Sequence, residues 1–493
     1  MDSYFTLQSN IEATGEFVDR KSRFIAQLVH IESEDEANAF IETVRKRHYD
    51  ARHNVPAWIL VDGRERQSDD GEPSRTSGMP TLEVLRGAAA AGAEIACLPE
   101  LCITGYTCGD LFFQPVLQQG ARDALADVLR DTAGLPLLFV LGLPLTHGGK
   151  LYNCAAVCQN GRVLGVVPKT HLPNYNEFYE KRQFTPAPAE NGVIDLSGAQ
   201  VPFGTNLLFQ CGTQPALTLA VEICEDLWAP LPPSTRHAMA GATLICNLSA
   251  SDETIGKAEY RRALVTGQSA RLLCGYVYAD AGEGESTTDM VFAGHNMVAE
   301  NGALLAETAP FCGGMALTDI DVERLAGERL KNTSFPAEDS ANYEVIPFVL
   351  PQNVSPLTRI VSSAPFVPAD AEQRARRCDA ILAMQASGLK KRLEHTHAKT
   401  AVVGISGGLD SCLALLVTVR AFSLLERPLS DIVAVTMPCF GTTERTRTNA
   451  QRLCEALSVT LQHVDITQTV RSNFADIGQD EARHDVTYEN TQA

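Results

Sequence analysis

Three segments of this sequence end an apolar run with a residue that could do chemistry. Cys224 follows the run LTLAVEI and is itself followed by two acids, Glu100 lies in LPELCITGY, and Lys169 lies in VLGVVPKTHLPNY. Amide hydrolysis through a thioester needs a nucleophile, a base and a charge stabiliser, and these three residue types could supply them. Taken singly, each type has a plainer interpretation, because a free cysteine is commonly a core thiol and Glu and Lys are commonly solvated.

The elements that must position these residues are apolar strands. From Ala88 to about residue 321, strands alternate with turns and helices, which predicts an α/β sandwich of sheets covered by helices. The expected strands are LLFVLGL from Leu137, NCAAVC from Asn153, VLGVVP from Val163, LTLAVEI from Leu217, TLICNLS from Thr243 and GYVYAD from Gly275. Each of the three candidate residues ends a strand, so one sheet edge could gather them.

A second candidate site is the glycine-rich segment GISGGLDS, which follows a strand and opens a helix. Glycines let backbone amides approach an anion closely, and a helix N-terminus adds positive potential. No Gly-Lys-Ser/Thr follows, so it is not a Walker A loop. Around it, the chain reads helix, strand, helix, strand, helix, strand, which predicts a parallel sheet of Rossmann-like type.

The motifs LPELCITGY, VVPKTHLPNYNEFYEKRQF and VEICEDLW, in this order, resemble the nitrilase-type glutaminase of the glutamine-dependent NAD synthetases. SGGLDS resembles the pyrophosphate-binding loop of the ATP pyrophosphatase group, and the end motif DVTYENTQA also matches the synthetases. The resemblance implies a nitrilase-like αββα sandwich followed by a Rossmann-like parallel α/β domain of the ATP pyrophosphatase type.

The resemblance also implies roles for residues of the first site. Cys224 attacks the side-chain carbonyl carbon of glutamine, Glu100 takes the thiol proton and later activates water, and Lys169 stabilises the oxyanion. Further positions match glutamine contacts at Tyr175, Ser251 and Lys257, a weaker substrate-side position at Tyr106, and the extra glutamate of nitrilases at Glu180.

For the second site, the resemblance implies that ATP with Mg²⁺ adenylates the nicotinate carboxylate of deamido-NAD, and that ammonia then displaces AMP to give NAD. The expected ATP-binding residues are Gly404, Ile405, Ser406, Gly407, Gly408, Leu409, Asp410 and Ser411. Asp410 is expected to assist Mg²⁺ and pyrophosphate, and Asn490 to contact deamido-NAD. ATP is a substrate here, and no tightly bound cofactor or protein metal site is expected.

The first part of the chain has a different character. Residues 1–86 form a small α+β segment that resembles the N-terminal part of the IMPACT/YigZ family through RKSRFIA, HYDARHN and SDDGEPS, with departures at Arg75 and Ser77. The expected division is this segment at 1–86, the glutaminase domain at 87–329, a Pro-rich linker at 330–372, and the synthetase ATP-binding domain at 373–493.

The part of the sequence that resembles the synthetases is shorter than the family pattern at both ends. Members of that family begin with a further strand and most of a helix before AAGAEIACLPE, and they continue beyond Ala493. We therefore expect two fragments joined near Arg86, with the glutaminase residues present but poorly supported, a truncated ATP-binding domain, and weak or absent ligation.

The composition of the chain excludes several classes of protein function. A net charge of −19, spread along 493 residues, argues against sequence-independent binding of nucleic acid phosphates. No apolar run is long enough for a bilayer, and the N-terminus lacks a signal core. Fourteen cysteines without a CxxC pair are typical of reduced thiols in a cytoplasmic protein. The family resemblance adds the expectation of a homo-oligomer.

Two alternatives stay open at this point. The chain could be an IMPACT-like regulatory or binding protein that carries a decayed enzyme portion, in which case replacing Cys224 would not affect its activity. It could also be a plain nitrilase-type amidase that releases ammonia without ATP. The amidotransferase-ligase is favoured because two separate motifs agree on one reaction.

Overall fold

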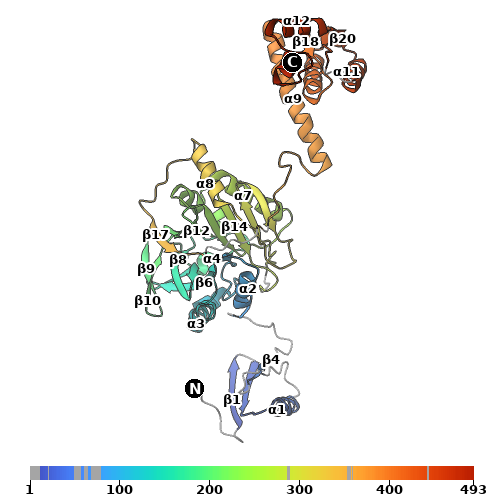
Figure 1. The fold of residues 1–493 in the computed structure, drawn as a ribbon. Helices are drawn as coiled ribbons and strands as arrows, with labels where there is room; N and C mark the ends of the chain where they lie inside the picture. Colours follow the sequence, from blue (N-terminus) through green and yellow to red (C-terminus); the bar gives the residue numbers. More distant parts are fainter. Residues whose placement is uncertain are drawn as a thin grey trace. The chain divides into compact units, whose positions relative to one another are not determined.

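The computed structural model describes residues 12–19, 22–48, 57–59, 65–67, 79–285, 289–351, 357, 359–440 and 444–492 (Figure 1). It divides the chain into two compact units, Met1–Arg359 and Ile360–Ala493, and each is described by itself. Among the described helices, none is both long enough and apolar enough to cross a membrane.

The N-terminal residues form a small α+β piece, as expected. Strands β1 (Glu12–Asp19) and β2 (Ser22–Val29) pair antiparallel, and α1 (Glu34–Arg47) follows. Helix α1 begins after Ser33, whose side chain accepts the backbone N–H of Glu36 at 3.3 Å as an N-cap. Short strands β3 (Ala57–Ile59) and β4 (Glu65–Gln67) also pair antiparallel. The polar loop Ser68–Gly78 lies outside the described residues.

The first large sheet has the strand order β5-β6-β7-β8-β10-β9. Its strands are β5 (Ile95–Cys97), β6 (Leu138–His147), β7 (Lys150–Gln159), β8 (Arg162–Pro168), β9 (Gly192–Leu196) and β10 (Ala199–Phe203). The second has the order β16-β15-β14-β13-β12-β11-β17. Its strands are β11 (Leu207–Cys211), β12 (Thr218–Ile223), β13 (Leu244–Ser249), β14 (Gly275–Asp280), β15 (Met297–Glu300), β16 (Ala303–Glu307) and β17 (Glu344–Phe348). All six strands expected from the apolar runs are present.

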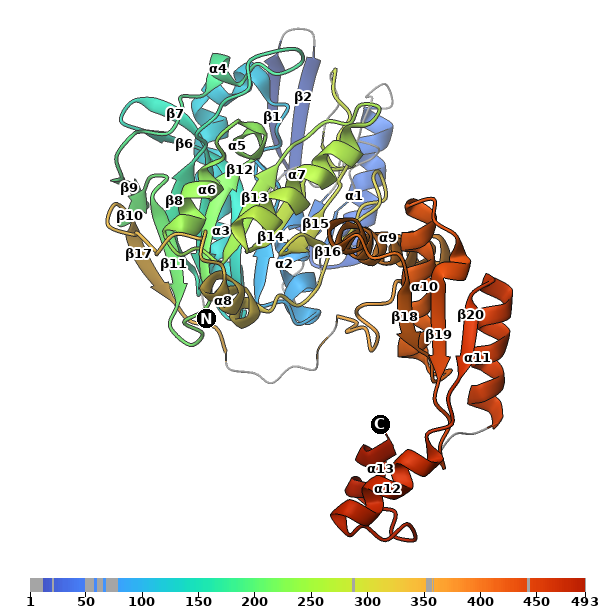
Figure 2. The ribbon, with the colours of Figure 1, turned by 90° about the horizontal axis from the view of Figure 1, so that it is seen from above.

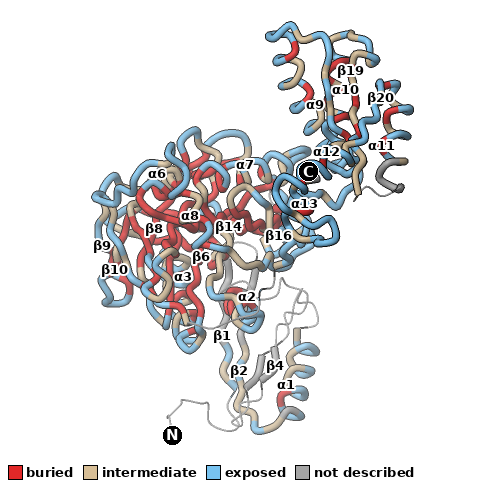
Figure 3. Tube along the Cα trace, turned by 45° about the horizontal axis from the view of Figure 1, so that its top comes forward, coloured by how far each residue is buried: buried red, intermediate tan, exposed pale blue. Residues whose placement is uncertain are grey.

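The two sheets pack face to face, and helices cover their outer faces (Figure 2). One buried cluster joins Val140 and Val157 of the first sheet to Val221 and Leu248 of the second, which places the deepest core between the sheets. The covering helices are α2 (Met79–Ala90) and α3 (Pro115–Thr132) on the first sheet, and α6 (Pro233–Met239) and α7 (Lys257–Leu272) on the second. Shorter elements are η1 (Gly109–Phe113), α4 (Glu180–Gln183), α5 (Glu225–Trp228) and α8 (Val322–Lys331). The expected αββα sandwich is therefore confirmed, and Figure 3 shows its strands as mostly buried.

The expected junction near Arg86 falls inside a continuous helix. Helix α2 runs from Met79 to Ala90, and Leu85 is fully buried in the core of the sandwich. Beside it, β5 is an edge strand that pairs, among the described residues, with β6 alone. A cavity of about 610 Å³ lies along this strand, lined by α2, β5, β14 and residues 313–322.

The expectation of a linker over 330–372 is wrong for Glu344–Phe348, which form β17. This strand pairs in parallel with β11 at the edge of the second sheet. Pro347 has no backbone N–H to donate, and an edge strand tolerates this because only one side of the strand is paired. The proline-rich composition concealed a short strand with one buried residue, Phe348.

The second unit contains the predicted parallel sheet. Its strands β18 (Ala401–Gly404), β19 (Ile432–Thr436) and β20 (Thr460–His463) lie in that order and run parallel. The helices are α9 (Ala371–Thr396), α10 (Leu409–Leu424), α11 (Glu444–Leu457), α12 (Thr467–Ile477) and α13 (Val486–Gln492), with η2 at Leu429–Asp431. Ala386, Leu415, Phe422 and Ala434 belong to its core, which is separate from those of the sandwich.

Candidate active site

The centre of the site is a buried cluster of charges. Lys169 directly follows β8, and its Nζ lies 2.6 Å from Glu100 Oε1 and 2.6 Å from Glu180 Oε1. Asn153 of β7 donates to the same Glu100 oxygen at 2.6 Å. The side chains of Lys169 and Glu100 are both fully buried, so their attraction is little weakened by water. The structure therefore brings together two of the three residues predicted to act on an amide.

Electrostatics explain how three charges share this small space. Burial opposes the charge on Lys169, but the adjacent carboxylates of Glu100 and Glu180 outweigh it and raise the pKa of Lys169 well above its usual value. The pKa of Glu180 is raised to about 7, because burial, together with the charge of Glu100, outweighs the opposing effect of Lys169. Tyr106 supports Glu180 by donating its hydroxyl hydrogen at 2.8 Å. Lys169 is thus a fixed positive charge at neutral pH.

Cys224 stands on a strained turn between β12 and α5. Its φ is 45° and its ψ is −99°, a conformation that is unfavourable for a residue with a Cβ. Burial, and then the charges of Glu100 and Glu180, raise the pKa of the Cys224 thiol well above its usual value, with Lys169 acting in the opposite direction. The resting thiol is therefore neutral, and its attack on a carbonyl requires a base to take the proton.

Residues at the end of β13 form hydrogen bonds with both Cys224 and Glu100. The backbone N–H of Cys224 donates to Leu248 O at 2.8 Å, and the N–H of Glu100 donates to Ser249 O at 3.2 Å. The next N–H along, that of Ala250, donates to the Glu100 side chain at 3.0 Å. Three consecutive residues of one strand end thus fix the positions of the expected nucleophile and the expected base.

The predicted glutamine contacts lie around α7 and α5. Lys257 opens α7, forms an ion pair with Asp252, and lies 5.5 Å from the ring centroids of both Phe178 and Trp228. Tyr175 is half exposed, and its hydroxyl donates to the Glu225 carboxylate at 2.9 Å. A cation and an anion therefore line this part of the site, as recognition of a zwitterionic amino acid requires.

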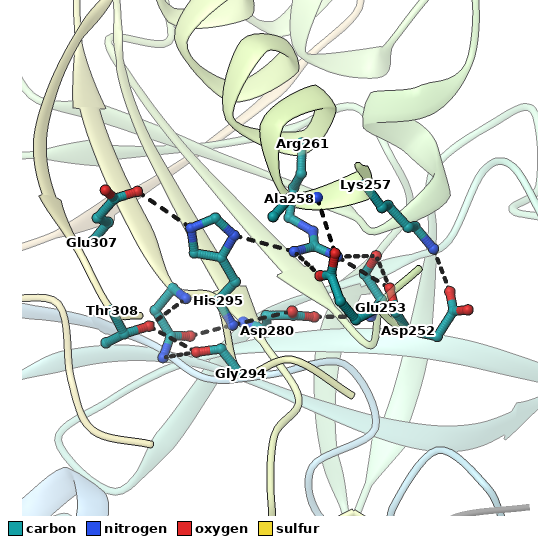
Figure 4. A network of polar contacts seen from close by, with 12 residues as sticks. Asp252, Glu253, Lys257, Ala258, Arg261, Asp280, Gly294, His295, Glu307 and Thr308 are labelled. Atoms are coloured by element: carbon teal, nitrogen blue, oxygen red, sulfur yellow. Dashed lines mark hydrogen bonds and ion pairs between the residues drawn. The ribbon is translucent and has the colours of Figure 1, made fainter. Parts of the chain in front are cut away.

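Arg261 of α7 contacts the loop that contains Asp252 and Glu253 (Figure 4). Ser251, which precedes them in this loop, is buried. The guanidinium of Arg261 is fully buried and donates to Ser251 Oγ at 3.2 Å, to Asp252 O at 3.1 Å and to Glu253 Oε2 at 3.0 Å. A fourth contact, at 3.1 Å, joins Arg261 to His295 Nδ1. One side chain thus fixes three successive loop residues.

Residues 77–329, a little over half of the chain, match the family Carbon-nitrogen hydrolase. The chain belongs to the carbon-nitrogen hydrolase family. Two further matches flank this one: Impact N-terminal domain over residues 20–97 and NAD synthase over residues 381–493. Both resemblances stated from the sequence are therefore supported, and the Impact match overlaps the carbon-nitrogen hydrolase match at residues 77–97.

Relatives of this carbon-nitrogen hydrolase carry the name "Glutamine-dependent NAD(+) synthetase". The protein from Mycobacterium bovis is 44% identical over 450 residues, which is 88% of this chain and 66% of that protein. The protein from Aquifex aeolicus is 26% identical over 81% of this chain and 65% of its own length. The chain thus covers slightly less than two thirds of the length of these relatives. A solved glutamine-dependent NAD+ synthetase from Acinetobacter baumannii aligns at 24% identity over 84% of this chain and 66% of its own, with a TM-score of 0.43.

The glycine-rich segment of this carbon-nitrogen hydrolase forms the predicted turn between β18 and α10. Gly407 has a φ of 84°, which a residue without Cβ adopts freely. The hydroxyls of Ser406 and Ser411 lie 3.2 Å apart, and Ser406 Oγ accepts the N–H of Gly408 at 3.3 Å. Ile405 is buried and anchors the turn through its N–H to Val435 O at 2.8 Å. An exposed loop with serine hydroxyls at the start of a 16-residue helix is suited to a phosphate chain.

Asn490 is exposed on α13, and no described contact joins it to the glycine-rich loop. Its role as a deamido-NAD contact stays a prediction. Within the described ranges, no group of three or more His, Cys, Asp and Glu side chains is arranged to hold a metal ion.

The sequence did not reveal every polar residue of the carbon-nitrogen hydrolase site. Asn153 was assigned only to a strand, Glu225 only to the acids after Cys224, and Arg261 was not singled out. Asn153 and Arg261 act through contacts with residues 53 and 10 positions away in the sequence, so spacing along the chain does not reveal them. Glu225 could have been noticed, because it directly follows Cys224, the expected nucleophile.

Proposed function

We propose that this chain hydrolyses glutamine to glutamate and ammonia through a thioester on Cys224. The observation that carries the proposal is the buried Lys169 and Glu100 pair, 2.6 Å apart, whose glutamate is tied by the end of β13 to the turn of Cys224. A neutral thiol, a carboxylate and a fixed ammonium are the groups that acyl transfer from an amide needs.

The chemistry follows from these positions. Cys224 Sγ attacks the side-chain carbonyl carbon of glutamine while Glu100 takes the thiol proton. Lys169 stabilises the negative charge that develops on the carbonyl oxygen. Glu100 returns the proton to the leaving nitrogen, so ammonia departs and a thioester remains. Glu100 then takes a proton from water, the hydroxide adds to the thioester, and glutamate leaves as the thiol regains its proton.

Substrate orientation comes from the groups around α7 and α5. Lys257 binds the α-carboxylate of glutamine, and Glu225, which accepts from Tyr175, binds the α-ammonium. Ser251, held by Arg261, supplies a further polar contact. This pairing favours an amino acid amide over a simple amide, because only a ligand with both charges can bind Lys257 and Glu225 at the same time.

We further propose that the second unit uses the ammonia in an ATP-dependent ligation. In this scheme the turn Gly404–Ser411 binds the phosphates of ATP, and Asp410 assists Mg²⁺. Adenylation of the nicotinate carboxylate of deamido-NAD releases diphosphate, and ammonia then displaces AMP to give NAD. The match of residues 381–493 to NAD synthase and the mycobacterial relatives support this step.

The remaining expectations belong to the same proposal. Glutamine, ATP and deamido-NAD are the partners, and the net charge of −19 disfavours nucleic acid. The structure joins none of the fourteen described cysteines in a disulfide, which suits a reducing cytoplasm. A homo-oligomer is proposed from the family resemblance, and light scattering of the purified chain tests it.

The experiment measures glutamate and NAD together. Purified protein receives ATP, Mg²⁺ and deamido-NAD, with either glutamine or ammonium as nitrogen donor. We expect glutamate only with glutamine, and NAD with either donor at the low rate that the sequence predicts for the ligation. Cys224→Ala should lose the glutamine route and keep the ammonium route. Cys246→Ala is the matched control, because Cys246 is a buried thiol on the neighbouring strand β13.

Other outcomes separate the alternatives. Glutamate without NAD from either donor would limit the chain to an amidase. Absence of both products from a folded, monodisperse preparation would contradict the proposal and favour a regulatory role for the IMPACT-like segment.

A further inference from the structure

A chain of buried hydrogen bonds runs from the backbone of Cys224 to the start of α6. Asn247 of β13 accepts the N–H of Cys224 on its Oδ1 at 3.1 Å and the hydroxyl of Ser249 on the same atom at 2.8 Å. Its Nδ2 donates to the hydroxyl oxygen of Tyr276 on β14 at 3.1 Å. Tyr276 in turn donates to Glu222 Oε1. The second oxygen of Glu222 accepts the N–H of Ser234 at 2.7 Å.

Each link of this chain fixes the direction of the next. Ser234 and Tyr276 both donate to Glu222, which as a carboxylate only accepts. The single hydroxyl hydrogen of Tyr276 is then used, so its oxygen is an acceptor and must face the NH₂ of Asn247. The carbonyl oxygen of Asn247 is thereby forced toward Cys224. All three side chains are at most 1% exposed, so water offers no substitute partner.

Asn247 accepts a hydrogen bond from the strained backbone of Cys224. Cys224 has a positive φ, and without a second acceptor its N–H would be held by Leu248 O alone. Strain of this kind persists where surrounding contacts over-determine the conformation. The turn also sets the direction of the thiol relative to Glu100, since the Cα–Cβ bond of Cys224 moves with its φ.

We propose that Asn247, oriented by Tyr276 and Glu222, is the positioning residue that holds Cys224 in its attacking conformation. This inference rests on the proposed glutaminase function and deepens it. Asn247 contacts neither the thiol proton nor the substrate in this scheme, and it acts only through the backbone of the nucleophile. The hydroxyl of Tyr276, two residues removed from Cys224 in the network, is then required for the rate of the chemical step.

The test uses two tyrosines on the same strand. Tyr276→Phe removes the hydroxyl that orients Asn247. Tyr278→Phe is the matched control, because Tyr278 is also buried on β14 but, among the described contacts, its hydroxyl bonds to neither Asn247 nor Glu222. We expect Tyr276→Phe to lower kcat for glutamine hydrolysis about 10- to 100-fold with KM changed less than about twofold, as misplacement of a reacting atom by about 1 Å would do. Tyr278→Phe should retain the wild-type values.

A second readout does not depend on glutamine. Iodoacetamide labelling of the full chain is followed by mass spectrometry at Cys224, at exposed Cys378 as the reference, and at fully buried Cys154 and Cys158 as reporters of unfolding. We expect the ratio of Cys224 to Cys378 labelling to fall about tenfold or more in Tyr276→Phe, with Cys154 and Cys158 unlabelled. Equal ratios in Tyr276→Phe, Tyr278→Phe and wild type would overturn the proposal.

The two proposals fail in different ways. If the wild type releases no glutamate but the labelling ratio still falls in Tyr276→Phe, the positioning inference stands and the substrate is wrong. If Cys154 becomes labelled in Tyr276→Phe, Asn247→Ala decides. That variant removes the acceptor of the Cys224 N–H directly. The same loss of labelling at Cys224 is then expected, and an unchanged ratio overturns the proposal.

Discussion

Lys169 Nζ lies 2.6 Å from Glu100 Oε1, and neither side chain is exposed to solvent. This contact pairs a positive charge with the carboxylate that we propose receives the Cys224 proton. Because the adjacent carboxylates raise the pKa of Lys169 well above its usual value, Lys169 stays charged and can stabilise the proposed oxyanion. In the proposed mechanism, one ion pair therefore serves both the first proton transfer and the stabilisation that follows it.

Replacing Glu100 by Gln tests the base. The amide keeps the size of the side chain but cannot accept the thiol proton, and Cys224 has a pKa well above its usual value. We expect kcat for glutamine hydrolysis to fall about 10²- to 10⁴-fold. Stopped assays of glutamate release measure this, with Glu94→Gln as a control carboxylate outside the site. A Glu100→Gln enzyme within threefold of wild type would rule out Glu100 as the base.

Glu180 gives the site a pH-dependent stability. Its pKa is about 7 in the folded protein and its usual value is 4.5, so between these values the folded state keeps a proton that the unfolded state releases. Stability therefore falls as pH rises through this window. Glu180→Gln lacks the titration. We expect wild type to lose about 1–3 kcal/mol relative to Glu180→Gln between pH 4.5 and 7.5, measured by urea unfolding. Parallel pH curves for the two proteins would contradict this.

Lys257 should determine affinity more than rate. It lies beside Trp228 and Phe178 and forms its ion pair with Asp252, not with Glu100 or Glu180, so removing it takes away the proposed contact with the α-carboxylate of glutamine. We expect Lys257→Ala to raise KM for glutamine about 10- to 100-fold with a small change in kcat. Arg262→Ala is the control on the same helix, since Arg262 is also ion-paired, with Glu307. Equal effects of the two variants would show that only the charge of α7 matters.

The sequence predicted the parts of this fold that depend on local pattern. Continuous apolar runs predicted β6, β7, β8, β12, β13 and β14, because strands buried on both faces need no polar alternation. Short strands with exposed or proline residues, such as β9, β10 and β17, gave no comparable pattern and were missed. Strand ends marked Glu100, Lys169 and Cys224, but their partners Asn153 and Arg261 depend on which strands become neighbours. Which strands become neighbours is a property of the tertiary structure. A single sequence reveals it only through resemblance to a known family.

Replacing Gly407 by Ala tests whether the glycine-rich turn before α10 binds ATP. Its φ of 84° is strained for any residue with a Cβ, by about 1–2 kcal/mol, so Gly407→Ala should distort the turn before α10. Gly388→Ala is the matched control in the same unit, because Gly388 lies within α9 with open space around it and alanine favours helix there. We expect Gly407→Ala to weaken binding of a fluorescent ATP analogue at least about tenfold, with Gly388→Ala unchanged. Glutamine hydrolysis without ATP should be equal in both, because Cys224 and its partners belong to the other unit. Undiminished nucleotide binding in Gly407→Ala would show that ATP binds away from this loop.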